Sequence, residues 1–290
     1  MNQTITQTVL ETTENRERAV LYRIPNNTND YIELTNYGCA LKSICIHDRQ
    51  GRLRNILLGG RQPEEDRYPT GGQGLIRDHL SPALSSCLSH KLWQTQEVGE
   101  NYVFLSCQVS EGESGLPTAL TFGARIMWVN RNRLIIDLFA SPERDACFAP
   151  AIHLALRLAE TDGYTLRTFC PQIVSGGQTL PAENTAYANM AFVPLAEESP
   201  VFLSSQEDVK PMAELASSAA GLTVSAYGNL DSLWAKRTPE SGAALCQAML
   251  RGITLKHGES FAGRVIYGFD HLYSPDEPES QEPSPFSVFL

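Results

Sequence analysis

The sequence predicts an all-β protein built as a large antiparallel sandwich or barrel. Short runs of alternating apolar and polar residues, or of β-branched and aromatic residues, recur along the whole chain. Turn-forming clusters such as 48–51 (DRQG) and 111–115 (EGESG) separate these runs. Helical patterns are scarce, and only the segment 207–221 suggests one or two helical turns. Regular strands joined by short loops are typical of antiparallel sandwiches and barrels.

The predicted strands are spread over most of the chain. They cover residues 31–38, 39–48, 101–110, 119–129, 133–141, 148–159, 221–228, 232–237 and 264–273. No linker divides this body, so we expect one domain over residues 1–273. Residues 274–290 are rich in Pro, Ser and Glu, a composition that suits a solvated tail or an extended strap.

Composition and charge exclude several classes of partner. Hydrophobic residues make up 42% of the chain, enough to bury a large core. The net charge of −10 repels phosphate backbones and anionic lipids, so neither nucleic acid nor a membrane surface is expected as a partner. No apolar run approaches the roughly 18 residues of a membrane-spanning helix. The N-terminus also lacks the basic start and apolar core of a secretory signal.

The cysteines point to a reducing compartment. There are seven, an odd number, no CxxC pair occurs, and several lie inside strand-like runs. Reduced thiols in the core of a cytoplasmic protein explain this pattern. Clustered Cys and His spacing is absent, so no metal site is expected, and no glycine-rich segment has the strand-to-helix setting of a phosphate loop. We therefore expect no cofactor.

Four segments, taken in order, resemble the aldose 1-epimerase (galactose mutarotase) family. The first, 31–60, has the family's opening turn at residues 36–38 and its hairpin at 48–51. The second, 115–158, carries His153 where the family has the strand "H-x-Y-F-N-L", with Ala155 and Arg157 in place of its Tyr and Asn. The other two segments are 228–236, similar to the family's "G-(Y/F)-D-H-x-F", and 252–269, similar to its closing turn and last strand. The chain is thus identified as a divergent relative.

The resemblance implies a fold and an activity. The fold is the large antiparallel β-sandwich called the galactose mutarotase-like supersandwich. The activity is that of an isomerase of carbohydrate metabolism, which binds a hexose or hexose derivative and interconverts its anomers, as a monomer or homodimer without a cofactor. This chemistry needs a base to take the proton of the anomeric hydroxyl and an acid to protonate the ring oxygen.

Of the two catalytic residues of the family, the chain retains the acid and replaces the base. His153 matches the family's acid, and its reference pKa near 6.5 suits proton donation near neutral pH. A core histidine bonded to the backbone is the alternative. Gln247 occupies the position of the glutamate base and cannot accept a proton, and the loss of a positioned base costs about 10²–10⁴-fold in rate. The nearby acids Glu240 and Glu259 lie in predicted exposed turns.

The resemblance also implies a set of residues that bind the sugar. Gln73 stands where some family members have a histidine, followed by the matching Arg77 and Asp78, and His79 is a possible substitute for that histidine. The alternative is a loop of ordinary polar residues. Asp231 matches the aspartate that binds sugar hydroxyls, and Trp234 either stacks on the sugar or packs in the core.

Arg157 has two interpretations. In a strand it shares the face of His153. It is therefore either a grip for a carboxylate or phosphate, or an edge residue that reaches water.

Two functions of different class remain open. One is an aldose 1-epimerase or close relative, and the other is a carbohydrate-binding protein that has lost its base. An epimerase for an acidic sugar is a third possibility, which depends on Arg77 and Arg157.

Overall fold

The computed structural model describes residues 4–10, 18–59, 74–158, 163–204, 208–238 and 243–272. Strands hold 57% of these residues and helices 8%, which confirms the predicted all-β class. The tail 274–290, and with it the predicted boundary at residue 273, lies outside the described residues.

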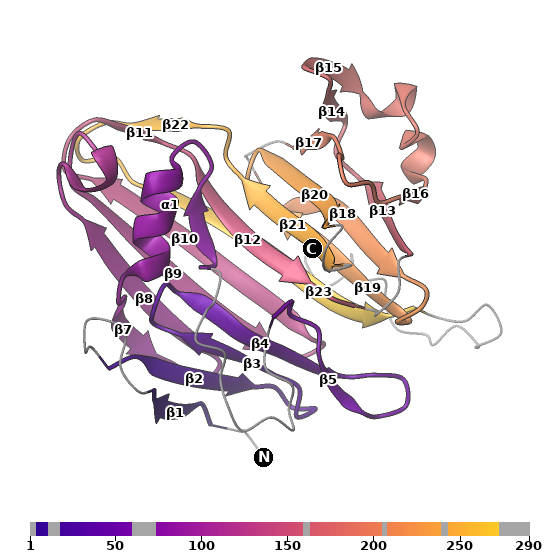
Figure 1. Ribbon diagram of the computed structural model, residues 1–290, viewed down its shortest axis with the longest axis horizontal. Coiled ribbons are helices and arrows are strands. Elements are labelled where there is room, and N and C mark those ends of the chain that lie inside the picture. Colours follow the sequence, from indigo (N-terminus) through magenta and orange to yellow (C-terminus); the bar gives the residue numbers. More distant parts are fainter. Residues whose placement is uncertain are drawn as a thin grey trace.

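The described strands form four sheets in which every pairing is antiparallel (Figure 1). The five-stranded sheet has the order β1 (Thr6–Val9), β2 (Val20–Pro25), β3 (Tyr31–Thr35), β4 (Ala40–His47), β5 (Leu53–Asn55). The nine-stranded sheet has the order β16 (Val193–Pro194), β13 (Tyr164–Thr168), β18 (Lys210–Ser217), β19 (Leu222–Gly228), β23 (Phe261–His271), β10 (Arg133–Pro142), β9 (Leu120–Val129), β8 (Tyr102–Val109), β7 (Gln94–Val98). The seven-stranded sheet has the order β15 (Gln178–Pro181), β14 (Gln172–Ser175), β17 (Val201–Leu203), β20 (Ser232–Thr238), β21 (Ala243–Met249), β12 (Pro150–Leu156), β6 (Ile76–Asp78). The last sheet pairs β11 (Ala146–Phe148) with β22 (Ile253–Leu255).

One α-helix, α1 (Pro82–His90), lies among the described residues, beside β6. The hydroxyl of Ser81 caps it by accepting the N–H of Leu84 at 3.1 Å, and Pro82 occupies the first turn. The remaining helices are the single 3₁₀ turns η1 (Glu113–Gly115), η2 (Ala182–Asn184) and η3 (Ala188–Met190). Sequence analysis did not identify α1.

The expectation of helical turns in 207–221 is wrong over most of that segment. Residues 210–217 form β18, which pairs with β19 on one side and, over residues 213–217, with β13 on the other. The local helix propensity of this segment does not decide its structure, because the strand forms hydrogen bonds with neighbouring strands on both sides within the sheet.

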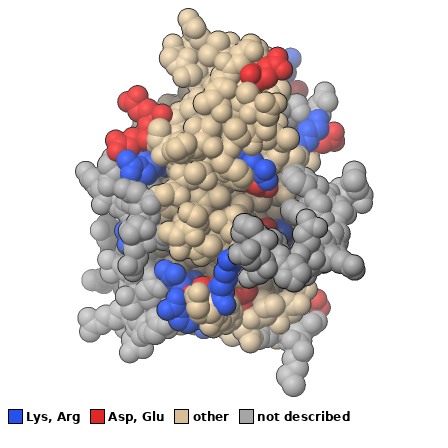
Figure 2. All heavy atoms as spheres, turned by 90° about the vertical axis from the view of Figure 1, so that its right-hand side faces the viewer, with Lys and Arg blue, Asp and Glu red and all other residues tan. Residues whose placement is uncertain are grey.

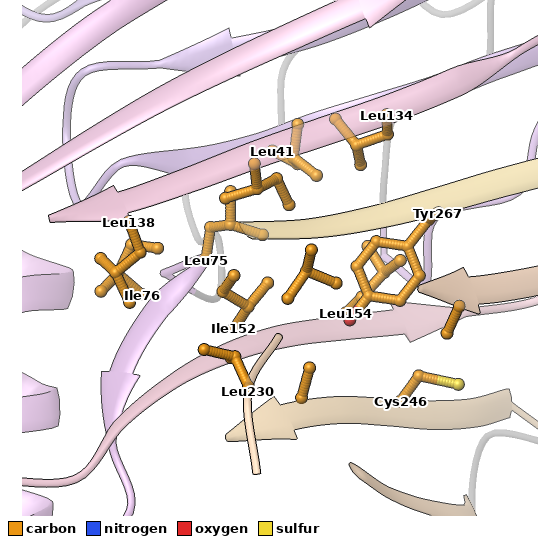
Figure 3. Packing of buried hydrophobic residues seen from close by; sticks show 14 of the residues in the cluster. Leu41, Leu75, Ile76, Leu134, Leu138, Ile152, Leu154, Leu230, Cys246 and Tyr267 are labelled. Carbon is orange, nitrogen blue, oxygen red and sulfur yellow. The ribbon is translucent and has the colours of Figure 1, made fainter. Parts of the chain in front are cut away.

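The core between the sheets fixes which way β12 faces. Ile152 and Leu154 of β12 point toward Leu134 and Leu138 of β10 and Tyr267 of β23 (Figure 3). All five are at most 1% exposed. Burying one Leu or Ile side chain stabilises the fold by about 1.5–3 kcal/mol. Because strand side chains alternate, the residues between them on β12 point away from this core.

Two glycines allow α1 to pack against the body of the protein. Gly38 has a φ of +70°, and a Cβ there would overlap the carbonyl oxygen of Ser89 in α1. A Cβ on Gly74, just before β6, would stand 2.5 Å from the hydroxyl of Ser89. The helix therefore sits directly on two backbone segments with no room for a side chain.

The exterior carries few features that indicate a partner. No helix among the described residues is long and apolar enough to cross a membrane. Figure 2 shows one face of the molecule, where charged side chains are sparse over the middle. Leu180, Met190 and Phe192 are exposed large apolar side chains in the segment from β14 to β16.

The packing of α1 predicts a difference between two glycine substitutions. Gly38→Ala should reduce the free energy of unfolding by about 3 kcal/mol, because strain at positive φ adds to a clash with Ser89. The control, Gly51→Ala, has a similar φ of +74° but nothing within 4 Å of the new methyl group. It should lose only about 1 kcal/mol. Urea unfolding of both variants measures the difference, and equal losses would contradict the close packing of α1.

Candidate functional site

The candidate site is organised by a row of side chains across the seven-stranded sheet. His153 in β12 is the register partner of Gln247 in β21, which is in turn the partner of Trp234 in β20. On the other side of β12, Arg77 in β6 pairs with Ala151, two residues from His153. Register partners share a face of the sheet, so these side chains all point away from the core. The fold thus brings together four residues that are far apart in sequence.

A pocket of about 470 Å³ opens on this face. Its volume lies within the range of about 300–1,000 Å³ that is usual for small-molecule sites. The described residues that line it are Gly74, Arg77, Asp78, His79, Pro82, Ser85, Ser86, Ser89, His90 and Gln247. It therefore lies between β6, α1 and β21.

Asp78 shapes the wall of this pocket through its own hydrogen bonds. Its carboxylate accepts the backbone N–H groups of Leu80 at 3.0 Å, Ser81 at 2.7 Å and Ala149 at 2.7 Å. The Ser85 hydroxyl donates to the backbone oxygen of Asp78 and accepts from its N–H. These bonds fix the turn that leads into α1, so the carboxylate is occupied by backbone donors.

Histidine side chains contribute to the same pocket. The ring Nδ1 of His90 lies 2.7 Å from the carbonyl oxygen of Ser86, which can only accept, so Nδ1 carries the proton. In the neutral ring Nε2 is then an acceptor. His79 is exposed, and its backbone N–H bonds to Ala149 at 2.7 Å.

Arg77 is the least compensated charge of the site. Its side chain is half-buried, and desolvation lowers the pKa of its guanidinium, which remains charged at neutral pH. The Nε atom is buried without a hydrogen-bond partner in the structure. No carboxylate among the described residues forms an ion pair with Arg77. Since an unpaired buried charge is costly, the guanidinium is poised to accept an anionic or strongly polar ligand.

His153 has a protonation behaviour that its sequence position does not predict. Burial, and then the nearby charge of Arg77, lowers the pKa of His153 to about 3. The imidazole is therefore neutral at physiological pH, and it can accept a proton or a hydrogen bond. The expected proton donor with a pKa near 6.5 is thus replaced by a neutral ring.

The amide of Gln247 is placed to meet a ligand. The residue is 8% exposed and lines the pocket. Its side-chain amide makes no hydrogen bond to any part of the chain that the structure describes. It therefore offers one acceptor and two donor hydrogens.

The described pocket lining does not include His153, Asp231, Arg157 or Trp234. The Asp231 carboxylate accepts the Ser232 hydroxyl at 2.9 Å and the N–H of Arg251 at 3.1 Å, which ties the end of β21 to the start of β20. Arg157 is exposed beyond the end of β12. The Trp234 ring has the Lys236 ammonium 4.8 Å from its centroid.

The other residues singled out in the sequence lie away from the pocket or outside the described part of the chain. Gln73 and Glu240 lie outside the described residues. Glu259 is in an exposed turn, where its carboxylate accepts the N–H of Lys256 at 2.8 Å. Across the described ranges, no three His, Cys, Asp or Glu side chains gather closely enough to hold a metal ion.

Sequence reasoning missed the wall of the pocket that α1 provides. Ser86, Ser89 and His90 reach the site only because the helix packs beside β6. The signal that predicts this helix is Ser81 followed by Pro82, an N-cap residue before a first-turn proline.

Comparison with solved structures identifies the fold. The GalM/aldose epimerase homologue from C. elegans has a TM-score of 0.71 at 13% identity, covering 88% of this chain and 100% of that one. Galactose 1-epimerase from Lactobacillus acidophilus NCFM has a TM-score of 0.71 at 15% identity, covering 93% and 100%. A galactose mutarotase-like protein from Lactobacillus casei has a TM-score of 0.65 at 11% identity, covering 86% and 100%. The chain therefore has the galactose mutarotase-like fold, as predicted.

Two comparisons at the level of sequence gave no match. No family model matches the chain, and no curated protein matches it.

The environment of His153 predicts its titration. We expect its ring resonances to stay unchanged between pH 8 and 5 in an NMR titration. In Arg77→Gln the pKa should rise, because one of the two influences that lower it is removed. A midpoint near 6.5 in the unsubstituted protein would contradict the buried position of the ring.

The same shift makes stability depend on pH. The unfolded chain takes up a proton on His153 near pH 6.5 and the folded chain only near pH 3. The neutral His153 therefore makes its full contribution to the free energy of unfolding above pH 6.5. As the pH falls below 6.5 this contribution is lost, by at most about 1.4 kcal/mol per pH unit. His153→Gln should flatten this dependence in urea unfolding at pH 7 and 5, whereas the exposed His271→Gln should not.

Proposed function

We propose that this protein binds a hexose or hexose derivative in the pocket between β6, α1 and β21, and interconverts its anomers slowly. The single observation that carries the proposal is the convergence of Arg77, His153 and Gln247 on one face of a galactose mutarotase-like sheet. Two of the structural neighbours are named as a galactose 1-epimerase and an aldose epimerase homologue.

The binding half of the proposal follows from the available polar groups. The guanidinium of Arg77 donates, the Gln247 amide donates and accepts, and His90 offers an acceptor at Nε2. A sugar is a ring of hydroxyl groups, each of which needs both kinds of partner. The roles that the resemblance implies for Gln73, Arg157, Asp231 and Trp234 stay predictions.

The catalytic half is expected to be weak. Gln247 lies beside His153, at the position assigned to the base, and an amide does not take up a proton near neutral pH. The carboxylate of Asp78 already accepts three backbone N–H groups. His153, which is neutral at pH 7, is the cross-strand neighbour of Gln247 but is not among the described residues that line the pocket.

Carbohydrate binding without turnover is the second candidate function. The observation that favours it is the same pair, an amide at the base position and an acid bound to the backbone. The two functions share the pocket and differ only in rate, so measurements of binding and of mutarotation on one preparation separate them.

The rate prediction concerns Gln247. Mutarotation of freshly dissolved α-glucose and α-galactose, followed by polarimetry, should be slow or equal to the buffer rate, while sugar binding persists. Gln247→Glu should raise the rate by about tenfold or more, because it supplies a group that can accept a proton.

The matched control is Gln94→Glu, the same change at an exposed position of β7. It should leave the rate unchanged. A rapid rate in the unsubstituted protein would place the base elsewhere, and a Gln247→Glu rate equal to that of the control would remove Gln247 from the base position.

A further inference from the structure

We propose that the pocket recognises the carboxylate of an acidic monosaccharide, a hexuronic acid, through the guanidinium of Arg77. This inference rests on the proposed function, because it names the class of sugar that the same pocket takes. It depends on the balance of charges around the pocket, on the geometry of β6 and on the chemistry of the guanidinium.

Among the described lining residues, the guanidinium of Arg77 is a positive charge without an ion-pair partner. The described lining residues other than Arg77 and Asp78 are glycine, proline, serine, glutamine and histidine. Arg77 and Asp78 are consecutive in β6, so their side chains leave the strand on opposite faces. The carboxylate of Asp78 is directed to the N–H groups of Leu80, Ser81 and Ala149. It therefore does not pair with Arg77.

The guanidinium of Arg77 has no carboxylate partner among the residues that the structure describes. It is half-buried, and its buried Nε atom has no hydrogen-bond partner in the structure. A carboxylate that accepts from this guanidinium replaces the lost hydration and neutralises the charge. The planar fork of an arginine matches the two oxygens of a carboxylate, which gives a bidentate contact.

Charge matching favours a carboxylate over a phosphate. A carboxylate brings one negative charge, which matches the charge of the Arg77 guanidinium one to one. A phosphate monoester brings about −1.5 to −2 at pH 7. The excess would be unmatched in a chain whose net charge is −10.

The remaining lining suits the rest of such a sugar. The Gln247 amide and the ring of His90 can form hydrogen bonds with hydroxyl groups. The volume of about 470 Å³ accommodates a single sugar ring.

The test compares ligands that share one pyranose ring and differ in the group at C6. Calorimetric titrations use D-glucuronate, its methyl ester, D-glucose and glucose 6-phosphate, with D-galacturonate and D-galactose as a second pair. We expect each uronate to bind at least tenfold more tightly than its neutral hexose, and the methyl ester to lose this advantage. Glucose 6-phosphate should bind more weakly than glucuronate.

Variants of Arg77 link the preference to this side chain. Arg77→Gln should bring uronate and hexose affinities together, and Arg77→Lys should retain part of the preference, since it keeps the charge and loses the fork. Arg18→Gln, which makes the same charge change at an exposed residue outside the pocket lining, should keep the full preference. Circular dichroism and the urea midpoint of each variant verify that it is folded.

The outcomes separate the two proposals. Equal affinity for glucose and glucuronate in the unsubstituted protein overturns the carboxylate site and leaves sugar binding in place. Tighter binding of glucose 6-phosphate also overturns it, in favour of a phosphate. A uronate preference that survives in folded Arg77→Gln overturns the assignment to Arg77. The absence of binding by every sugar overturns both proposals.

Discussion

The alternation of side chains along β12 is the constraint on which the rest of the structure depends. Ile152 and Leu154 are buried against β10 and β23, so a shift of one residue would place His153 in the core and two aliphatic side chains on the opposite face of the sheet (Figure 3). The strand is also paired on both edges, with β21 and with β6. The core therefore fixes the register, and the register brings Arg77 and Gln247 to either side of His153.

The electrostatics of the site follow from that arrangement. Arg77 lies close enough to His153 to disfavour its protonation, and burial of the ring acts in the same direction. The outcome is a row of side chains with one fixed positive charge, a neutral imidazole and a neutral amide, of which Arg77 and Gln247 line the pocket. Such a set of groups binds polar ligands readily, but it has little capacity to move protons.

Sequence patterns predicted the parts of the fold that depend on local order. The alternation in 148–159 and the order of four family-like segments were enough to predict the sandwich. They could not reveal how Asp78 and Asp231 are used, because their partners include the backbone N–H groups of Ala149 and Arg251, which lie about 71 and 20 residues away. The strand β18 was missed because its helix-forming residues are held by two neighbouring strands.

The packing of α1 against Gly38 connects the five-stranded sheet with the seven-stranded sheet, which share no strand. Gly38 belongs to the turn between β3 and β4, in the five-stranded sheet, whereas the helix forms a wall of the pocket in the seven-stranded sheet. The N–H of Gly38 also donates to the carbonyl oxygen of Lys91, the residue that follows the helix, at 2.8 Å. Local opening of the five-stranded sheet would therefore release α1 and remove one wall of the pocket while the central sandwich is still folded. The shape of the pocket thus depends on a sheet none of whose described strands contributes a residue to the pocket lining.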